Sequence, residues 1–369
     1  MKHMKDIINE KMLNYFKLRT PNGGGVVKDI LARPPMEEYS INVGDNDYLC
    51  IASSVNMSTS SSDEIVFSNV FALEGAQCNL EERFSKFLKQ EASLITQSGY
   101  AANTGIMQSI CDKSTHLYVD RLLHSSFRDG IALKKAKAHG FKHNDLDDLE
   151  AKIQKFGPGI IMVEGLYSLD GDHAPLRDII ALKKKYSCIL LVDESHSLGV
   201  FGPNGMGYSG TLEEYSEIDI YTASLAKCFG SRAGIIAGSQ LLIDFVKETS
   251  FHNIFSSAVM NYDIIRIDKI LTKISEMDAE RAYLLTISKL LHDAIPKKFL
   301  KSKTGDITPI VSIVFDNEKD LVDMNQWLHT KQIFPACFIA PATDRPAIRF
   351  TLNCRITVDQ LSICQDLSY

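Results

Sequence analysis

Hydrophobic and polar positions follow two alternating periods from about residue 80 onward. In LEERFSKFLKQ (80–90) apolar residues recur every three or four positions, as on one helix face, whereas THLYVD (115–120) is short and β-prone. Two nearly continuous apolar runs follow, GIIMVEGLY (159–167) and CILLVDESH (188–196), and the helical pattern LRDIIALKKKY (176–186) separates them. Apolar strands joined by a helix are typical of a βαβ unit in a parallel sheet. The pattern therefore predicts an α/β fold with a mostly parallel central sheet.

The pattern changes after about residue 245. A long helical stretch spans about 259–293, and a strand (310–315), a helix through LVDMNQWLH (321–329) and the strand AIRFTL (347–352) follow it. A chain of 369 residues also exceeds the roughly 250–300 residues at which one core usually stops growing. We therefore expect a large domain and a smaller α+β C-terminal domain. The expected division is an N-terminal segment (1–45), the large domain (46–250) and the small domain (251–369).

Polar side chains follow each apolar strand of the predicted sheet. They are Glu164 and Ser168 after the first run, Asp193 and His196 after the second, and Ser224 and Lys227 after EIDIYTA (217–223). Ligands of open α/β sheets bind outside the carboxyl ends of the strands. We therefore expect these side chains to converge on one site.

Lys227 and Asp193 are residue types that pyridoxal phosphate (PLP) chemistry requires. A lone lysine in this position would usually be a surface charge, but apolar surroundings such as Leu225 and Phe229 lower a lysine pKa and favour a nucleophilic amine. Asp193 follows an apolar strand, where a carboxylate needs a cationic or hydrogen-bonded partner. Asp193 could cap the start of a helix, with backbone N–H groups as partners, or it could pair with a pyridinium nitrogen. His196, three residues on, is placed to reach the hydroxyl of the same ring.

Three further segments contribute candidates. Ser98, Gly99 and Tyr100 precede a predicted helix, where free backbone N–H groups favour an anion, although an N-cap is the simpler interpretation. His124 alone would be an ordinary half-buried histidine. In AIRFTLN the residue Arg349 alternates with apolar neighbours, so it faces either solvent or the cleft.

Composition and charge exclude several classes of protein. The formal charge of -6 argues against a nucleic-acid partner. The eight cysteines are scattered, without metal-ligand spacing, so we expect reduced thiols and no metal. The charged start and the absence of a long apolar run predict a cytoplasmic protein without a membrane span.

A collinear set of motifs runs from about residue 42 to the end of the chain. Its pieces are NDYL (46–49), SGYAAN (98–103), HSSFRDG (124–130), HNDLDDLE (143–150), EGLYSLDGDHAPL (164–176), LLVDESHSLGVFGPNGMG (190–207) and SLAKCFG (224–230). Together they resemble the α-oxoamine synthases, the PLP-dependent branch of the fold-type I superfamily that condenses acyl-CoA. This resemblance implies that the chain is a PLP-dependent acyltransferase and a homodimer whose active site lies at the subunit interface.

The resemblance also implies residue roles. Lys227 would bond covalently to the cofactor, Asp193 would pair with the pyridine nitrogen, and His196 with the ring hydroxyl. His124 would stack on the ring, and Arg349 would hold the substrate carboxylate. The remaining implied contacts are Ser98, Gly99, Tyr100 and Ser224 at the phosphate, Ser256 and Ser257 from the other subunit, and Ser168 and Asn46 near cofactor and substrate.

Within the family, TASLAKCF, VDESHSLG, GPGII and the late APAT are most similar to bacterial synthases of α-aminoketone and α-hydroxyketone quorum-sensing autoinducers. That subgroup implies condensation of a medium- or long-chain fatty acyl-CoA with S-adenosylmethionine or 2-aminobutyrate, with decarboxylation. Two departures stand out. Arg232 enters the lysine loop, and FALEGAQCNLEE (71–82) replaces the glycine-rich, histidine-containing stretch of the biosynthetic members.

Three alternatives remain open from the sequence. The first is a biosynthetic member of the family that makes aminoketobutyrate, 8-amino-7-oxononanoate, aminolevulinate or a sphingoid base. The second is a non-catalytic partner subunit, whose signature would be loss of the lysine. The third, a PLP-sensing transcription regulator, would need a DNA-binding module that the forty or so residues upstream of the motifs do not show.

Overall fold

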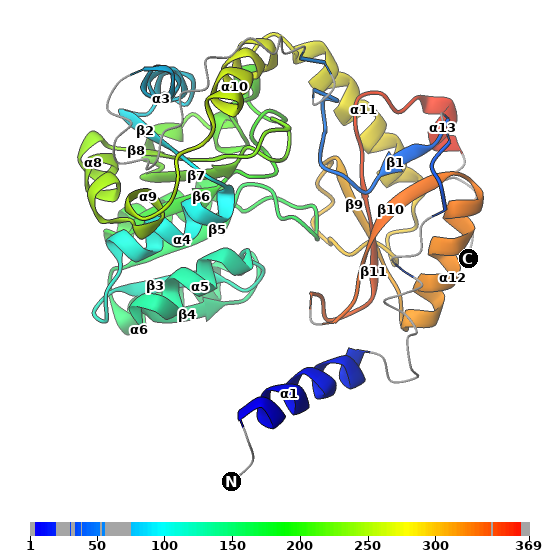
Figure 1. Ribbon diagram of the computed structural model, residues 1–369, viewed down its shortest axis with the longest axis horizontal. Coiled ribbons are helices and arrows are strands. Elements are labelled where there is room, and N and C mark those ends of the chain that lie inside the picture. The colour runs from blue at the N-terminus through cyan, green and yellow to red at the C-terminus, as the bar shows by residue number, and fades with distance from the viewer. Residues whose placement is uncertain are drawn as a thin grey trace.

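Two β-sheets organise the chain, and Figure 1 shows them beside each other. The computed structural model describes residues 4–19, 30, 34–37, 39–51, 54–55, 75–340 and 342–362. The larger sheet has seven strands in the order β2-β8-β7-β6-β5-β3-β4. Their bounds are β2 (Ala92–Thr96), β8 (Gly234–Gly238), β7 (Ile220–Ser224), β6 (Ile189–Asp193), β5 (Ile160–Glu164), β3 (His116–Asp120) and β4 (Lys137–Phe141). Only β8 runs against the others, so the predicted mostly parallel α/β sheet is confirmed.

Helices cover both faces of this sheet. Side chains of α4, α5 and α8 pack with one set of inward residues, including Leu117 and Met162, whereas α6 and α7 pack with the alternate set, including Tyr118 and Ile161. Burial on both faces is why the strands read as unbroken apolar runs. The helix bounds are α3 (Ala76–Phe87), α4 (Gly99–Ile110), α5 (Ser125–Lys134), α6 (Leu146–Phe156), α7 (Leu176–Tyr186), α8 (Gln240–Thr249) and α9 (Phe251–Ile254). Short 3₁₀ turns lie at 203–205, 209–211 and 215–217.

The second sheet has four strands in the order β1-β10-β11-β9. Its strands are β1 (Ile41–Val43), β9 (Ile310–Val314), β10 (Ile333–Phe338) and β11 (Ala347–Thr351), and its helices are α12 (Glu318–Thr330) and α13 (Val358–Ser362). Strand β1, far upstream in the sequence, pairs in parallel with β10. The sheet therefore combines residues from both ends of the chain.

The long helical stretch predicted over 259–293 is two helices, α10 (Asn261–Ile274) and α11 (Asp278–Ala294). Buried Arg281 explains the break, because its Nη1 donates to the carbonyl oxygens of Ile274 at 2.7 Å and of Gly199 at 3.3 Å. The guanidinium thus satisfies a carbonyl at the end of α10. In Figure 1 the two helices pass from one sheet to the other.

Helix α1 (Met4–Arg19) lies apart from both sheets in Figure 1. Among the helices that the structure describes, we find none with the length and apolar character needed to span a bilayer.

Candidate functional site

The carboxyl ends of β5, β6 and β7 meet at one edge of the large sheet. Glu164 pairs with Asp193 in register, and Asp193 pairs with Thr222. Strand β7 ends at Ser224, and Lys227 follows in the next turn. The expected convergence of polar residues at this edge is therefore present in the structure.

The Asp193 carboxylate is buried and held from two sides. Its Oδ2 accepts from Asn103 Nδ2 at 2.7 Å, and its Oδ1 accepts from the backbone N of Ser195 at 2.9 Å and from Ser195 Oγ at 2.5 Å. No helix begins directly after Asp193, so the N-cap alternative for this residue is wrong. Both oxygens are held in a fixed orientation, and each can accept one further hydrogen bond.

His196 is also buried and is oriented by Tyr48. Its Nδ1 lies 2.8 Å from the Tyr48 hydroxyl, and its Nε2 has no hydrogen-bond partner among the described residues. Burial, with added repulsion from Lys227 and Arg349, holds the pKa of His196 well below its usual value. The imidazole is therefore neutral at physiological pH and can donate or accept at the free nitrogen.

Lys227 is half-buried, and its amine has no hydrogen-bond or ion-pair partner in the described part of the chain. Burial and the charge of Arg349 lower its pKa, while Asp193 and Glu164 oppose this shift. The side chain lines a cavity of about 340 Å³ with seven other residues. These are Asp45, Asn46, Asp47, Ala226, Gly230, Ser231 and Arg232. A desolvated amine beside an open space can attack a carbonyl carbon.

Ser98 and Gly99 begin α4 beside Ser224. Ser98 Oγ accepts from the backbone N of Ala101 at 3.1 Å, so the simple N-cap role is present. A β-carbon on Gly99 would lie 2.6 Å from Ser224 Cβ, which only glycine avoids. Tyr100 is exposed, and its hydroxyl donates to Asp129. The start of α4 therefore offers backbone N–H groups close to Ser224, an arrangement that suits a phosphate.

His124 caps the start of α5 and presents its ring outward. Its backbone N donates to Glu164 Oε1 at 2.7 Å, and its Nδ1 lies 2.8 Å from Ser126 Oγ. Burial and the neighbouring Asp193 raise the pKa of Glu164 well above its usual value. The ring of His124 is thus positioned by its own cap and by the end of β5.

Arg349 is buried rather than exposed to solvent. Its Nη1 donates to the carbonyl oxygen of Ser168 at 2.7 Å, and its Nη2 to Asn46 Oδ1 at 3.4 Å. Its Nε is buried without a partner within the described residues, and its guanidinium lies 5.0 Å from the centre of the Phe338 ring. A buried guanidinium with an unsatisfied N–H is suited to an anionic ligand.

Ser256 and Ser257 follow α9. The carbonyl oxygen of Ser257 accepts from Gln97 Nε2 at 2.6 Å, which places the segment beside the start of α4. Neither hydroxyl bonds another of the predicted site residues within the described chain.

Sequence reasoning missed three residues that hold the site. Asn103 and Ser195 fix Asp193, and Tyr48 fixes His196. Asn103 lies one turn after Gly99 on α4, so helical spacing could have flagged it. Tyr48 is 148 residues from His196, and no local pattern marks such a pair.

The two departures noted in the sequence have different outcomes. Arg232 is exposed and lines the cavity of Lys227. Residues 71–74 of the FALEGAQCNLEE stretch lie outside the described residues, and Gly75 precedes α3, which the rest of the stretch enters.

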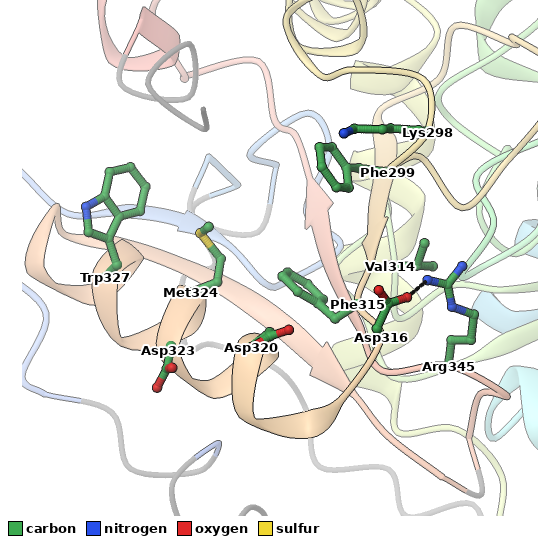
Figure 2. A pocket seen from close by; sticks show the side chains of 10 residues that line it. All are labelled: Lys298, Phe299, Val314, Phe315, Asp316, Asp320, Asp323, Met324, Trp327 and Arg345. Atoms are coloured by element: carbon green, nitrogen blue, oxygen red, sulfur yellow. Dashed lines mark hydrogen bonds and ion pairs between the residues drawn. The ribbon is translucent and has the colours of Figure 1, made fainter. Parts of the chain in front are cut away.

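A larger cavity of about 750 Å³ lies on the four-stranded sheet and shares no lining residue with the cavity of Lys227. Figure 2 shows Phe299 and Phe315 beside it, Trp327 at its far end on α12, and the ion pair of Asp316 and Arg345. Within the described residues, no group of three or more His, Cys, Asp or Glu side chains could hold a metal ion.

A parallel α/β sheet with a desolvated lysine, a fixed buried carboxylate and a helix start beside a serine is the arrangement of a PLP-dependent enzyme. The family model described as aminotransferase class I and II matches residues 60–362. The chain belongs to this family and is a PLP-dependent acyltransferase of the α-oxoamine synthase type.

Individual relatives agree with this assignment. The chain is 33% identical over 351 residues to the CAI-1 autoinducer synthase of Vibrio campbellii, covering 91% of this chain and 88% of the relative. It is 31% identical to the 8-amino-7-oxononanoate synthase of Petrotoga mobilis, covering 79% of this chain and 74% of that relative.

Solved structures show the same fold. Serine palmitoyltransferase of Sphingomonas wittichii superposes with a TM-score of 0.80 at 21% identity, covering 89% of this chain and 86% of that one. The 8-amino-7-oxononanoate synthase of Francisella tularensis superposes with a TM-score of 0.77 at 23% identity, covering 89% of this chain and 97% of that one.

Proposed function

We propose that the protein condenses a medium- or long-chain fatty acyl-CoA with S-adenosylmethionine or 2-aminobutyrate, with loss of CO₂. The product is an α-aminoketone, the precursor of an α-hydroxyketone quorum-sensing signal. The similarity to an autoinducer synthase over 91% of the chain supports this choice of substrates. The same residues serve the cofactor whichever substrates are used.

The residues of the site fit PLP. Lys227 would bond to the aldehyde carbon, Asp193 would accept a hydrogen bond from the pyridinium N–H and keep that nitrogen protonated, and His196 Nε2 would reach the ring hydroxyl. The outward ring of His124 would cover one face. Ser98, Gly99, Tyr100 and Ser224 would hold the phosphate, with Ser256 and Ser257 of a second subunit closing the site of a homodimer. When bound, PLP supplies an electron sink next to the substrate Cα.

Arg349 and Lys227 would then act on the amino donor. The unsatisfied Nε–H of Arg349 would donate a hydrogen bond to the α-carboxylate, while the contacts with Ser168 and Asn46 hold the guanidinium in its orientation. Lys227 Nζ would be freed when the amine of the donor takes its place on the cofactor, and the lysine amine, whose pKa is lowered by burial, would then take the proton from Cα. The acyl donor then forms a carbon–carbon bond at Cα, its thioester C–S bond breaks, and CoA and CO₂ leave.

The test is a titration of the PLP-loaded protein with S-adenosylmethionine, 2-aminobutyrate, glycine, serine and alanine in turn, read by visible absorbance. Decanoyl-CoA is then added and products are read by mass spectrometry. A spectral response selective for the first two amines, followed by an aminoketone, would support the proposal. A response confined to glycine, serine or alanine would favour the second candidate, a biosynthetic synthase, which the similarity to 8-amino-7-oxononanoate synthases also supports.

The covalent role of Lys227 can be tested separately. Borohydride reduction of the PLP-loaded protein should place the cofactor mass on the peptide that contains Lys227. Lys227→Ala should lose this label and lower turnover by at least ~10³-fold, because both the covalent bond and the base are removed. The matched control Lys113→Ala, which removes an exposed lysine, should keep both the cofactor label and wild-type turnover. A label that persists in Lys227→Ala would refute the assignment.

A further inference from the structure

Cys50 and Cys354 meet where the segment that carries Asn46 and Tyr48 crosses the loop after β11. The backbone N of Cys354 donates to the carbonyl oxygen of Tyr48 at 2.9 Å. Cys50 Sγ lies 3.2 Å from Asn353 Oδ1, and Arg355 Nη2 donates to the carbonyl oxygen of Cys50 at 3.3 Å. Contacts from three successive residues thus hold the loop against Cys50 and set Cys354 beside it.

The two thiols differ in exposure and acidity. Cys50 is buried, whereas Cys354 is partly exposed. The neighbouring Cys50 side chain lowers the pKa of the Cys354 thiol, whereas Cys354 and burial raise the pKa of the Cys50 thiol. The thiolate is the reactive form of cysteine, so Cys354 is the nucleophile of the pair and Cys50 is its buried neighbour.

The backbone at Cys50 is unusual for a residue with a side chain. Its φ is +50°, in the left-handed region that favours glycine. The thiol is therefore placed beside Cys354 by a conformation that a β-carbon disfavours.

We propose that Cys50 and Cys354 are an oxidation site, at which a small disulfide such as oxidised glutathione converts the two thiols into an intramolecular disulfide. The proposal does not depend on which substrates the enzyme uses. Closing the bond needs the two sulfur atoms to approach to about 2.05 Å.

The reaction proceeds by two thiol–disulfide exchanges. The Cys354 thiolate attacks one sulfur of oxidised glutathione, forms a mixed disulfide and releases one glutathione thiolate. The Cys50 thiol then gives up its proton and attacks Sγ of Cys354, which releases the second glutathione. Two protein thiols lose two electrons, and one molecule of oxidised glutathione gains them.

The disulfide would tie together two parts of the active site. Asn46 accepts from Arg349 on β11, and Tyr48 orients His196 after β6, so the segment before Cys50 contacts residues carried by both sheets. Strand β11, which carries Arg349, ends just before Cys354. The crosslink would fix the separation of these two parts.

The experiment exposes the native PLP-loaded enzyme to oxidised glutathione, blocks remaining thiols with N-ethylmaleimide after denaturation, and maps peptides without reduction. We expect a peptide pair joined through Cys50 and Cys354, lighter than the sum of its reduced parts by two hydrogen atoms. Cys50→Gly, a residue that suits φ +50° and should fold, should instead accumulate glutathione on Cys354. Cys354→Ser should leave Cys50 unmodified.

The matched control is Cys188→Ser, which removes another buried thiol and should leave the Cys50–Cys354 crosslink at the wild-type level. Two outcomes would overturn the proposal. One is that Cys354 stays reduced while Cys78 or Cys337, which are also partly exposed, become modified. The other is that wild-type protein and Cys50→Gly carry equal glutathione on Cys354, since Cys50 would then not complete the exchange.

Discussion

Gly99 shows how one atom can decide whether the start of α4 holds a phosphate. A β-carbon there would lie 2.6 Å from Ser224 Cβ and 2.8 Å from Ser224 Cα, so Gly99→Ala must push α4 from the end of β7. Overpacking of this kind typically costs about 1–3 kcal/mol, and here it falls on the proposed phosphate contacts. We expect Gly99→Ala to weaken PLP binding by at least ~10-fold, measured by equilibrium dialysis.

The control for this variant is Gly140→Ala, because the nearest atom to a β-carbon at Gly140 is the Val119 carbonyl oxygen at 3.9 Å. Gly140→Ala should keep wild-type affinity for PLP. Equal affinity in both variants would mean that the start of α4 does not contact the phosphate.

Arg349 is the second residue whose role can be separated from folding. Charge-assisted hydrogen bonds contribute about 1.5–3 kcal/mol, so Arg349→Ala should raise KM for the amino donor ~10- to 100-fold. KM for the acyl-CoA should change little, because only the amine carries the α-carboxylate. Steady-state kinetics with each substrate varied in turn measures both values.

Arg345→Ala supplies the comparison for Arg349→Ala. Arg345 is exposed and paired with Asp316, so its removal should leave both KM values at the wild-type level. A similar rise in both KM values for Arg349→Ala would exclude a specific carboxylate contact.

At the residue scale, the sequence predicts side chains that follow strands and misses those that hold them. Asp193 and Lys227 could be located because parallel strands end at one edge, which is a property of the fold class. The contact of Tyr48 with His196 joins residues 148 apart and depends on how the segment before Cys50 folds back. Local periodicity carries no information about such a pair.

At the element scale, His143 links β3 to the loop that follows β5. Its Nδ1 lies 3.0 Å from Asp120 Oδ1 and its Nε2 3.1 Å from Asp172 Oδ2, and both carboxylates are buried. Burial alone would lower the pKa of His143, but the hydrogen bonds to the two aspartates outweigh it and raise the pKa to about 10. The bridging group is therefore an imidazolium at neutral pH.

This bridge predicts a loss of stability at high pH. A pKa raised in the folded state gives stability that is complete below the unfolded value of about 6.5 and is lost as pH rises through about 10. We expect the free energy of unfolding to fall by a few kcal/mol across this window, measured by urea denaturation of the PLP-loaded protein. His143→Gln should reduce this dependence of the free energy of unfolding on pH. His292→Gln should leave it unchanged, because His292 does not contact Asp120 or Asp172. An equal slope in His143→Gln and wild type would refute the bridge.

Elements themselves were largely predictable, but their boundaries depended on distant contacts. The apolar runs predicted β5 and β6 because both faces of the sheet are covered. The division of the 259–293 stretch into α10 and α11 was not predictable, because Arg281 completes the end of α10 with help from Gly199, 82 residues away. Helical periodicity continues on both sides of that break.

At the scale of the whole molecule, the segment after α9 carries the proposed second-subunit contacts. Phe255 is 77% exposed and Phe251 58% exposed, and they lie next to Ser256 and Ser257. Exposed aromatic side chains gathered in one place are typical of a protein–protein interface. The bond from Gln97 to Ser257 sets this segment beside Ser98, so a second subunit that covers the phenylalanines would also approach the phosphate site.

Phe255→Glu should therefore break the proposed homodimer and weaken PLP binding together. A charge in the centre of an interface commonly costs at least about 2 kcal/mol, and we expect the dimer Kd to rise ~30-fold or more. Sedimentation velocity over a concentration series measures the Kd, and dialysis measures PLP. Leu133→Glu, which places the same charge on another exposed apolar residue at the end of α5, should change neither the dimer Kd nor PLP binding. If Phe255→Glu stays dimeric, this segment is not the interface. If it becomes monomeric yet binds PLP as tightly as wild type, Ser256 and Ser257 do not complete the partner's site.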